Sequence, residues 1–258
     1  WFAERGLRRL SPTGPDDRAR GSAGPVGRAD HADADHADRA APGLRIAGAA
    51  VALPGRGPLW RIDDLALPER GVIGVTGANG SGKTTLARLV LGLLRCRGAR
   101  LEIDGRRRRR RARRRRCAYV MQDVDYQLVA ESVLAELLDA SAPSAQGRER
   151  AEALLERVGL TGLADRHPLT LSGGQKQRLG IALACMKRAR VVCLDEPTSG
   201  LDAAGMRRVA ALLREMADDG ALVLVITHDH ELADLAFDHV IHLRSGRADL
   251  RPHHQKEH

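Results

Sequence analysis

The chain has 258 residues, enough for one large α/β domain or two small ones. Aromatic residues make up only 2% of it, so Leu, Val, Ile and Ala must build the core. The formal net charge is +9, but ten arginines lie between positions 106 and 116, and the other 32 Lys and Arg nearly balance the 33 Asp and Glu. The basicity is therefore local, and it does not predict a specific nucleic-acid partner.

The cysteines and the apolar runs argue against a secreted or membrane-spanning chain. The four cysteines are scattered without a CxxC pair, which is typical of core residues in a reducing compartment and not of a disulfide frame or zinc site. No apolar run reaches the roughly 18 residues that span a bilayer, and no signal peptide is visible. We expect a soluble, cytoplasmic protein whose membrane part, if it needs one, is another chain. The first residue is Trp1, so the true N-terminus stays open.

Residues 1–43 predict a disordered, low-complexity tail, because they are rich in Arg, Asp, Gly and Pro and lack apolar periodicity. Within this tail, His31, Asp33, Asp35, His36 and Asp38 could ligate a divalent cation. The alternative is that they belong to a solvated segment, and the composition favours this alternative.

From residue 44 the pattern alternates between strands and helices. Continuous apolar runs fit strands that are buried on both faces of a parallel sheet. The expected strands are 44–53, 59–67, 72–75, 191–194, 222–226 and 240–243. The expected helices are 84–94, 132–139, 149–158, 174–186 and 203–217. This order predicts one α/β domain over residues 44–248, with a helical insert at about 124–175, followed by a polar tail over 249–258.

Residues 77–84 match the pattern G-x-x-x-x-G-K-[ST] between an expected strand and an expected helix. Glycines let several backbone N–H groups point at one phosphate chain, and the helix adds its positive N-terminal end. Lys83 would contact the β and γ phosphates, and Thr84 would offer its hydroxyl to Mg²⁺. The residues expected to bind a nucleoside triphosphate here are Gly77, Asn79, Gly80, Ser81, Gly82, Lys83, Thr84 and Thr85.

Two adjacent acids follow the apolar run 191–194. The expected strand would carry Asp195 and Glu196 to its carboxyl end, where α/β sheets bind ligands. Asp195 would hold Mg²⁺ through water. Glu196 would polarise the attacking water as a general base.

Residues 171–175 read Leu-Ser-Gly-Gly-Gln and resemble the signature motif of ABC ATPases. Gln122, residues 199–202 and His228 occupy the family's Q-loop, D-loop and switch positions in the right order. The resemblance covers about residues 44–248. It implies a P-loop NTPase core with a parallel-rich sheet, an N-terminal antiparallel β subdomain and an inserted helical subdomain.

The resemblance also implies a mechanism. Two such subunits, identical or different, would pack head to tail and hold each ATP between the phosphate loop of one and the signature motif of the other. Glu196, His228 and Gln122 would be catalytic, and Thr84, Gln122 and Asp195 would hold Mg²⁺. The residues that would contact ATP across the subunit interface are Ser172, Gly173, Gly174, Gln175 and Asp202.

Residues 120–128 and 131–136, together with His167-Pro168, resemble the ATPases of energy-coupling-factor importers of the cobalt and vitamin type. This resemblance implies a transmembrane coupling protein, a separate substrate-binding membrane component, and a place on the cytoplasmic face of the cell membrane. The cargo would be a vitamin or a transition-metal ion. The alternative is a soluble ABC ATPase of translation or DNA repair, although one cassette without long heptads favours transport. A nucleotide kinase would have no use for the signature motif.

Three features depart from the family pattern or need a partner. Leu53 falls where members of the family stack adenine on an aromatic ring, and the nearby Trp60 lies beyond the turn and fits a core position. The run 106–116 predicts a flexible solvated loop, since ten like charges repel each other; attraction to anionic lipid or RNA is the alternative. Residues 126–129, Tyr-Gln-Leu-Val, predict a docking surface for the membrane partner, or else a segment tucked into the core.

Overall fold

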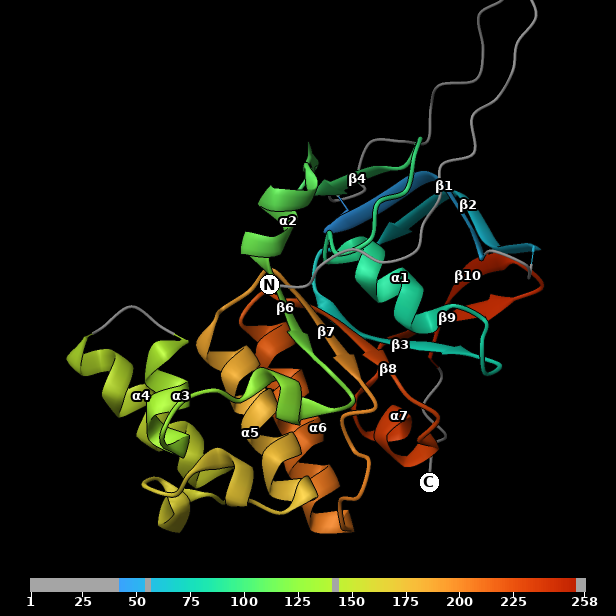
Figure 1. Cartoon of the computed structure of the whole chain (residues 1–258). Coiled ribbons are helices and arrows are strands. Elements are labelled where there is room, and N and C mark those ends of the chain that lie inside the picture. Colours follow the sequence, from blue (N-terminus) through green and yellow to red (C-terminus); the bar gives the residue numbers. More distant parts are fainter. Residues whose placement is uncertain (1–41, 54–56, 141–143, 254–258) are drawn as a thin grey trace, which may run out of the picture. The chain divides into compact units, whose positions relative to one another are not determined.

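The computed structural model describes residues 42–53, 57–140 and 144–253, with the side chain of Leu53 excluded. The predicted disordered tail up to residue 41, including the possible cation ligands between His31 and Asp38, lies outside the described residues. Figure 1 shows the described elements, which form two sheets and a group of helices. The strands are β1 (Leu44–Leu53), β2 (Gly57–Leu67), β3 (Gly71–Gly77), β4 (Arg100–Ile103), β5 (Arg106–Arg107), β6 (Cys117–Val120), β7 (Val191–Asp195), β8 (Leu222–Ile226), β9 (His239–Arg244) and β10 (Arg247–Pro252). The helices are α1 (Lys83–Val90), α2 (Arg110–Arg116), α3 (Val133–Asp139), α4 (Ala145–Arg157), α5 (Gly173–Met186), α6 (Ala203–Asp218) and α7 (His230–Ala236), with short 3-10 turns η1 (Val124–Gln127), η2 (Thr161–Leu163) and η3 (Pro168–Thr170).

The larger sheet has six strands in the order β10-β9-β3-β8-β7-β6. All neighbouring pairs are parallel except β9 and β10, which form an antiparallel hairpin. The parallel strands therefore end at one edge of the sheet, and the loops that leave β3, β6, β7 and β8 meet there. This edge places the residues of the predicted site.

Burial in the parallel strands alternates between two cores. Val191 and Cys193 face a core shared with α1 and the smaller sheet, whereas Val192 and Leu194 face a core shared with α5 and α6. Side chains of successive strand residues point to opposite faces, so a strand covered on both sides must be apolar throughout. The continuous apolar runs were a correct indication of buried strands.

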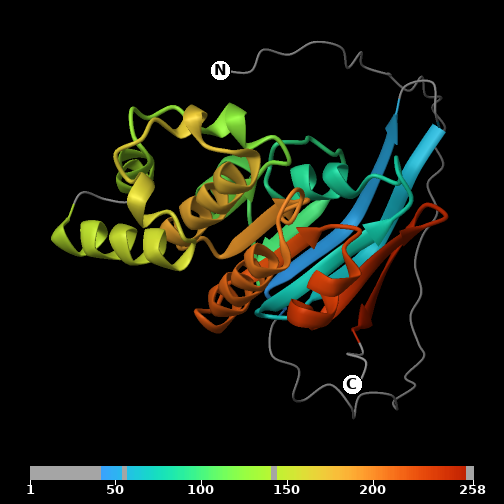
Figure 2. The same ribbon diagram turned by 90° about the horizontal axis from the view of Figure 1, so that it is seen from below.

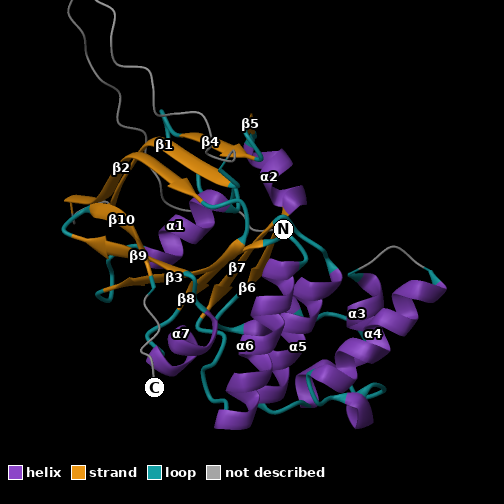
Figure 3. Cartoon of the chain, turned by 180° about the vertical axis from the view of Figure 1, so that it is seen from behind, coloured by secondary structure: helices purple, strands orange, loops and turns teal. Residues whose placement is uncertain are grey.

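The smaller sheet is antiparallel, in the order β2-β1-β4-β5. It packs on the same core cluster as α1, so that α1 lies between the two sheets, while α5 and α6 cover the opposite face of the larger sheet, as Figure 3 shows. The predicted architecture, a P-loop core with an antiparallel β subdomain and a helical insert, is confirmed by this arrangement and by the structural neighbours reported below.

The segment between η1 and α5 is helical. Ser132 caps α3 by accepting a hydrogen bond from the backbone N–H of Ala135, and Ser144 caps α4 in the same way through Gly147. In Figure 2 these green and yellow helices lie on the opposite side of the domain from the blue strand β1. No described helix combines the length and the apolar character needed to cross a bilayer.

Several predicted boundaries were wrong, and helix α4, for example, begins at Ala145 and not at residue 149. Helix α1 ends at Val90 and not at Leu94, because Gly92 adopts a positive φ of 75° and the N–H of Leu93 bonds back to the carbonyl of Arg88. The domain also continues past residue 248. Ser245 and Gly246 form a turn with positive φ, and β10 then pairs with β9 as far as Pro252.

The interpretation of the arginine run as a solvated loop was wrong as well. Its first residues form β5 and its last form α2. Arg113 is only 5% exposed and donates hydrogen bonds to the carbonyls of Leu89 at 3.1 Å and Val90 at 3.0 Å. Arg110 donates to the carbonyls of Gly92 and Leu93. The last carbonyls of a helix have no partner inside it, so Arg113 supplies donors for the end of α1, and Arg110 binds the turn that follows the helix.

Candidate functional site

A cavity of about 720 Å³ lies at the carboxyl edge of the larger sheet. Four loops contribute to it, because β3, β6, β7 and β8 all end at this edge. The predicted site residues that line it are Asn79, Gly80, Gly82, Lys83, Thr84, Thr85, Gln122, Asp195, Glu196 and His228. Residues more than a hundred positions apart in the sequence thus share one cavity.

The Gly-rich loop closes the cavity at the N-terminal end of α1. Lys83 is buried and donates from Nζ to the carbonyls of Gly77 at 2.8 Å and Ala78 at 3.3 Å, so its ammonium group lies within the curl of the loop. The Oγ of Ser81 is buried without a hydrogen-bond partner in the described part of the chain. The loop therefore offers a cation, backbone N–H groups and a free hydroxyl to an anion.

Gly82 shows why the loop requires glycine at this position. Its φ is 97°, and a Cβ there would lie 2.5 Å from Nε1 of Trp60. The Trp60 indole N–H points to the carbonyl of Gly82 at 3.3 Å, and Trp60 itself is fully buried. Trp60 is therefore a core residue that packs against the Gly-rich loop at Gly82.

Thr84 and Asp195 are in direct contact at the cavity wall. The Thr84 hydroxyl donates to Oδ2 of Asp195 at 2.9 Å, and the Tyr119 hydroxyl donates to the same oxygen at 3.2 Å. Burial, followed by the charge of Asp195 and this hydrogen bond, raises the pKa of Tyr119, so the phenol stays protonated. A hydroxyl and a carboxylate are oxygen ligands of the kind Mg²⁺ prefers, and this pair could hold the ion.

Glu196 has an unusual backbone conformation for a glutamate, with φ at 50°. Three contacts hold it there. Its N–H bonds to the carbonyl of Ile226 at 2.8 Å, its Oε2 accepts from the Thr227 hydroxyl at 3.0 Å, and its carbonyl accepts from the Gln177 side chain at 3.4 Å. Non-glycine residues at positive φ are uncommon and cluster at functional sites. The fold thus fixes this carboxylate at the cavity wall.

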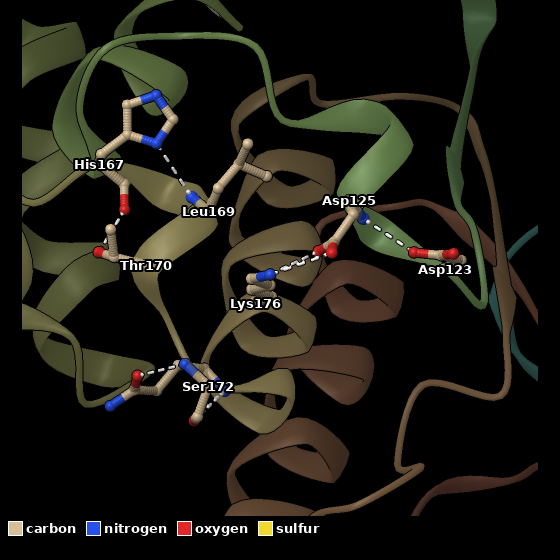
Figure 4. Close-up of polar contacts among 8 residues, drawn as sticks. Asp123, Asp125, His167, Leu169, Thr170, Ser172 and Lys176 are labelled. Atoms are coloured by element: carbon tan, nitrogen blue, oxygen red, sulfur yellow. Dashed lines mark hydrogen bonds and ion pairs between the residues drawn. The ribbon is translucent and has the colours of Figure 1, made fainter.

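The signature residues lie at the start of α5. The Ser172 side chain accepts from the N–H of Gln175, and the Gln175 side chain accepts from the N–H of Ser172, which is a capping box (Figure 4). Ser172 and Gly173 are exposed. Among the described residues, those lining the cavity do not include Ser172–Gln175, Asp202, Gly77 or Ser81.

Asp202 has a local contact as well, since its side chain accepts from the N–H of Gly205 and caps α6. Gly174 packs closely on this D-loop segment, because a Cβ there would lie 3.1 Å from Leu201. The signature helix and the D-loop therefore form one surface beside the cavity and outside it.

Figure 4 also shows how the Q-loop segment is joined to α5. Lys176 directly follows the signature residues and forms an ion pair with Asp125 at 2.9 Å. At the end of η1, Gln127 bonds to the backbone of Tyr119 and Met121, and the next residue, Leu128, is only 5% exposed. In contrast, Tyr126 and Val129 are 72% and 88% exposed. The predicted four-residue docking surface is thus wrong for two residues, because Gln127 is hydrogen-bonded to the backbone and Leu128 is buried in the core.

Several residues of this site were not predicted. Leu59, Thr198 and Asp229 line the cavity, and Tyr119 and Thr227 hold the two predicted acids. Thr227 could have been noticed as a polar residue between an apolar strand and His228. The side chain of Leu53, the predicted neighbour of adenine, lies outside the described part of the chain, whereas Leu59 offers an apolar surface to the cavity.

The arrangement defines a class of protein that binds a phosphate chain between a Gly-rich loop and a pair of acids. Comparison with known proteins narrows this class. The family model described as ABC transporter matches residues 62–199. The chain belongs to the ABC transporter family, and its fold is that of the family's ATPase domain.

Named relatives agree with this family. The chain is 36% identical over 180 residues to the energy-coupling factor transporter ATP-binding protein EcfA1 of Thermotoga maritima, covering 68% of this chain and 69% of the relative. It is 36% identical over 202 residues to the cobalt import ATP-binding protein CbiO of Rhodobacter capsulatus, covering 74% and 72%. The structure of cbiO1 from Clostridium perfringens, part of the ABC transporter complex cbiONQ, matches with a TM-score of 0.71 and 29% identity over 82% of this chain and 88% of that one.

Other relatives are much longer than the matched region. Two ABC transporter ATP-binding proteins of Treponema denticola are 38% and 37% identical to this chain, but the chain spans only 38% and 36% of their lengths. The similarity therefore covers one ATPase domain, and what a whole transporter does is a matter for proposal.

Proposed function

We propose that this chain binds and hydrolyses ATP and thereby powers a membrane importer of the energy-coupling-factor type, whose cargo is a vitamin or a transition-metal ion. The observation that carries the ATPase activity is the shared cavity, which combines the Lys83 loop, the Thr84–Asp195 pair and the fixed carboxylate of Glu196. The names of relatives support the importer type, since they include EcfA1, CbiO and an HMP/thiamine import protein of Bacillus subtilis at 32% identity.

The loop and α1 would bind the phosphates. Lys83 would exchange its bonds to the Gly77 and Ala78 carbonyls for phosphate oxygens, and the orphan Ser81 hydroxyl would gain an acceptor. The first N–H groups of α1 lack partners inside the helix and add a positive end. Leu59 at the rim would contact the base.

Thr84 and Asp195 would hold Mg²⁺, with Gln122 nearby, and the ion would neutralise charge on the phosphates. Glu196 would accept a proton from the attacking water. Its positive φ and the Thr227 hydrogen bond keep the carboxylate in place, so little reorganisation is needed when the water arrives. His228 is exposed at the same cavity and would position the water against the terminal phosphate.

A second ATPase subunit would complete the site. Ser172 and Gly173 are exposed at the start of a 14-residue helix, yet they do not line the described cavity of their own chain. A helix N-terminus attracts anions, so these groups would contact the ATP held by the other subunit. ATP would then bridge the two copies, and hydrolysis would release them.

We place the protein at the cytoplasmic face of the membrane, bound to a transmembrane coupling protein that works with a substrate-binding membrane component. The support is the context of its named relatives and the exposed pair Tyr126 and Val129 next to the Q-loop. Exposed aromatic and apolar side chains of this kind often anchor protein interfaces.

The experiment that tests the ATPase assignment is Glu196→Gln. We expect ATP binding to persist while hydrolysis falls by roughly 10²- to 10⁴-fold, the usual contribution of a general base. In ATP the variant should remain a dimer on gel filtration, since the bridging nucleotide is not cleaved. Glu231→Gln, an exposed acid on α7, is the matched control and should behave like the unmodified protein. Normal hydrolysis by Glu196→Gln would falsify the general-base assignment.

A further inference from the structure

A second concave surface, away from the nucleotide cavity, is formed by the arginine run. This groove has a volume of about 790 Å³ and lies between α2 and the end of α1 with the loop that follows it. Eight arginines line it, and no acidic residue is among the described residues that do so. They are Arg95, Arg107, Arg108, Arg109, Arg110, Arg111, Arg113 and Arg114. We call this surface the basic groove.

The charges of the basic groove are not neutralised within the described part of the chain. The ion pair formed by the run joins Arg116 to Asp104 at 3.7 Å, outside the groove lining. Arg108 has a buried Nε without a hydrogen-bond partner in the described residues. Like charges three or four residues apart destabilise a helix, and α2 contains several such pairs. An external anion would relieve this repulsion.

Hydrogen bonds and the larger sheet hold the groove in the fold. Arg113 binds the last carbonyls of α1, Arg110 binds those of the turn after α1, and α2 continues directly into β6 of the larger sheet. The exposed members Arg111 and Arg114 are therefore held on one short helix, and the exposed Arg109 is its N-cap residue. The electrostatic attraction of such a cluster does not require the ordering of a loop.

The apolar part of the groove indicates the kind of anion. Leu94, Ala99 and Leu101 contribute to its lining. Leu93, whose carbonyl binds Arg110, is 48% exposed at the same end of α1. Surfaces that bind lipid combine basic side chains with exposed apolar ones. Single-stranded nucleic acid is usually held by aromatic stacking, and no aromatic residue is among the described residues that line the groove.

We propose that the basic groove binds the surface of a bilayer that contains anionic phospholipid, with guanidinium groups on the phosphates and Leu93 in the interfacial layer. The groove does not share lining residues with the nucleotide cavity, so this contact is independent of ATP binding. It would be a direct contact with lipid, in addition to any docking on a membrane protein.

The test is flotation of the purified full chain, without nucleotide, with phosphatidylcholine vesicles that contain either no or about 30% phosphatidylglycerol. We expect binding only to the anionic vesicles. Each basic residue near an anionic surface contributes roughly fivefold to binding, so neutralising four with Arg109→Gln, Arg111→Gln, Arg114→Gln and Arg115→Gln should lower partitioning by roughly 10²- to 10³-fold. These four are exposed and make none of the capping bonds to α1. Raising the salt from about 0.1 M to about 1 M should also release the protein, because the Debye length falls from roughly 10 Å to 3 Å.

Two sets of matched variants control for net charge and for folding. Arg207→Gln, Arg244→Gln, Arg247→Gln and Arg251→Gln remove four exposed charges elsewhere and should leave vesicle binding almost unchanged. Lysine at positions 109, 111, 114 and 115 keeps the charge and should preserve binding, whereas Leu93→Ser should weaken it several-fold.

Three outcomes would overturn the proposal. The first is no binding to anionic vesicles. The second is an equal loss with the control set, which would mean that only net charge matters. The third is displacement from the vesicles by a short single-stranded RNA at equal phosphate concentration, which would identify a nucleic-acid surface. Hydrolysis of ATP in solution is measured in parallel, so that failure of the ATPase assignment is seen separately.

Discussion

The unpaired backbone groups at the two ends of helix α1 are satisfied in different ways. The first N–H groups and the last carbonyls of any helix lack partners inside it. At the N-terminal end, the Gly-rich loop brings Lys83 and backbone N–H groups to the wall of a cavity, and the buried Ser81 hydroxyl in the same loop has no hydrogen-bond partner in the described part of the chain. At the C-terminal end, Arg113 donates to the carbonyls of Leu89 and Val90, and Arg110 donates to the carbonyls of the turn that follows the helix.

The difference separates function from stability along a helix of eight residues. The N–H groups at the N-terminal end stay available for a ligand that binds and dissociates. The carbonyls at the C-terminal end accept hydrogen bonds from the chain itself. Substitutions at the first end should therefore change binding without unfolding the protein, and substitutions at the second should do the reverse. The following predictions test this contrast, from the largest expected effect to the smallest.

Lys83→Ala should weaken ATP binding by roughly 10²- to 10⁴-fold. A hydrogen bond to a charged group contributes about 1.5–3 kcal/mol, and we expect Lys83 to contact two phosphates. Titration with a fluorescent ATP analogue measures the affinity, and circular dichroism should show an unchanged fold. Lys187→Ala, at the exposed end of α5, is the control. Unchanged affinity in Lys83→Ala would contradict the proposal that the N-terminal end of α1 binds the phosphates of ATP.

Arg113→Met should lower the free energy of unfolding by about 2–4 kcal/mol, because the buried carbonyls of Leu89 and Val90 and the part-buried carbonyl of Arg108 lose this donor. Urea denaturation measures this change. Arg114→Met removes the neighbouring exposed arginine and should cost less than about 0.5 kcal/mol. Under conditions in which both variants are folded, they should retain ATP affinity. If the two variants denature at the same urea concentration, the capping role of Arg113 is wrong.

The ion pair between Asp125 and Lys176 extends the comparison to α5, whose N-terminal end is proposed to contact a ligand and whose first turns are tied to the Q-loop. The pair is partly exposed, so a double-mutant cycle with Asp125→Ala and Lys176→Ala should give a coupling energy of about 0.2–1 kcal/mol. The measurement is urea denaturation of the four proteins. A coupling energy of zero would mean that the contact does not join the two segments in solution.

Tyr126→Ala combined with Val129→Ala should have the smallest effect on the isolated subunit, because both side chains are exposed. Hydrolysis and stability should stay within experimental error of the unmodified protein. Copurification with the transmembrane partner from membranes should weaken, since an aromatic anchor is lost. Leu235→Ala, another exposed apolar residue on α7, is the control. Intact assembly of the double variant would exclude this pair as the docking surface.

Much of the site was readable from local sequence. Residues 77–84, the acids after β7 and the signature residues are short motifs whose residue types are needed together by one piece of chemistry. Their structural context was also readable, because continuous apolar runs predict strands buried on both faces. Parallel strands end at one edge, so the cavity that joins Lys83, Asp195 and His228 follows from the strand assignments.

The supporting contacts were not readable, because they depend on register between distant segments. Tyr119 reaches Asp195 only because β6 pairs in parallel with β7 and sets Tyr119 opposite Cys193. In the sequence, Gln127 and Leu128 look like part of an exposed Tyr-Gln-Leu-Val stretch. In the structure, a turn buries Leu128, and the Gln127 side chain accepts a hydrogen bond from the backbone N–H of Met121.

The arginine run marks the limit most clearly. In the sequence Arg113 and Arg114 are equivalent members of one charged stretch, and repulsion between them predicts a solvated loop. The sequence by itself determined the nucleotide-binding motifs, because their chemistry is carried by consecutive residues. Only the tertiary structure decided which arginine is buried, because a buried charge is tolerated where unpaired carbonyls receive it, and those carbonyls belong to a helix more than twenty residues away.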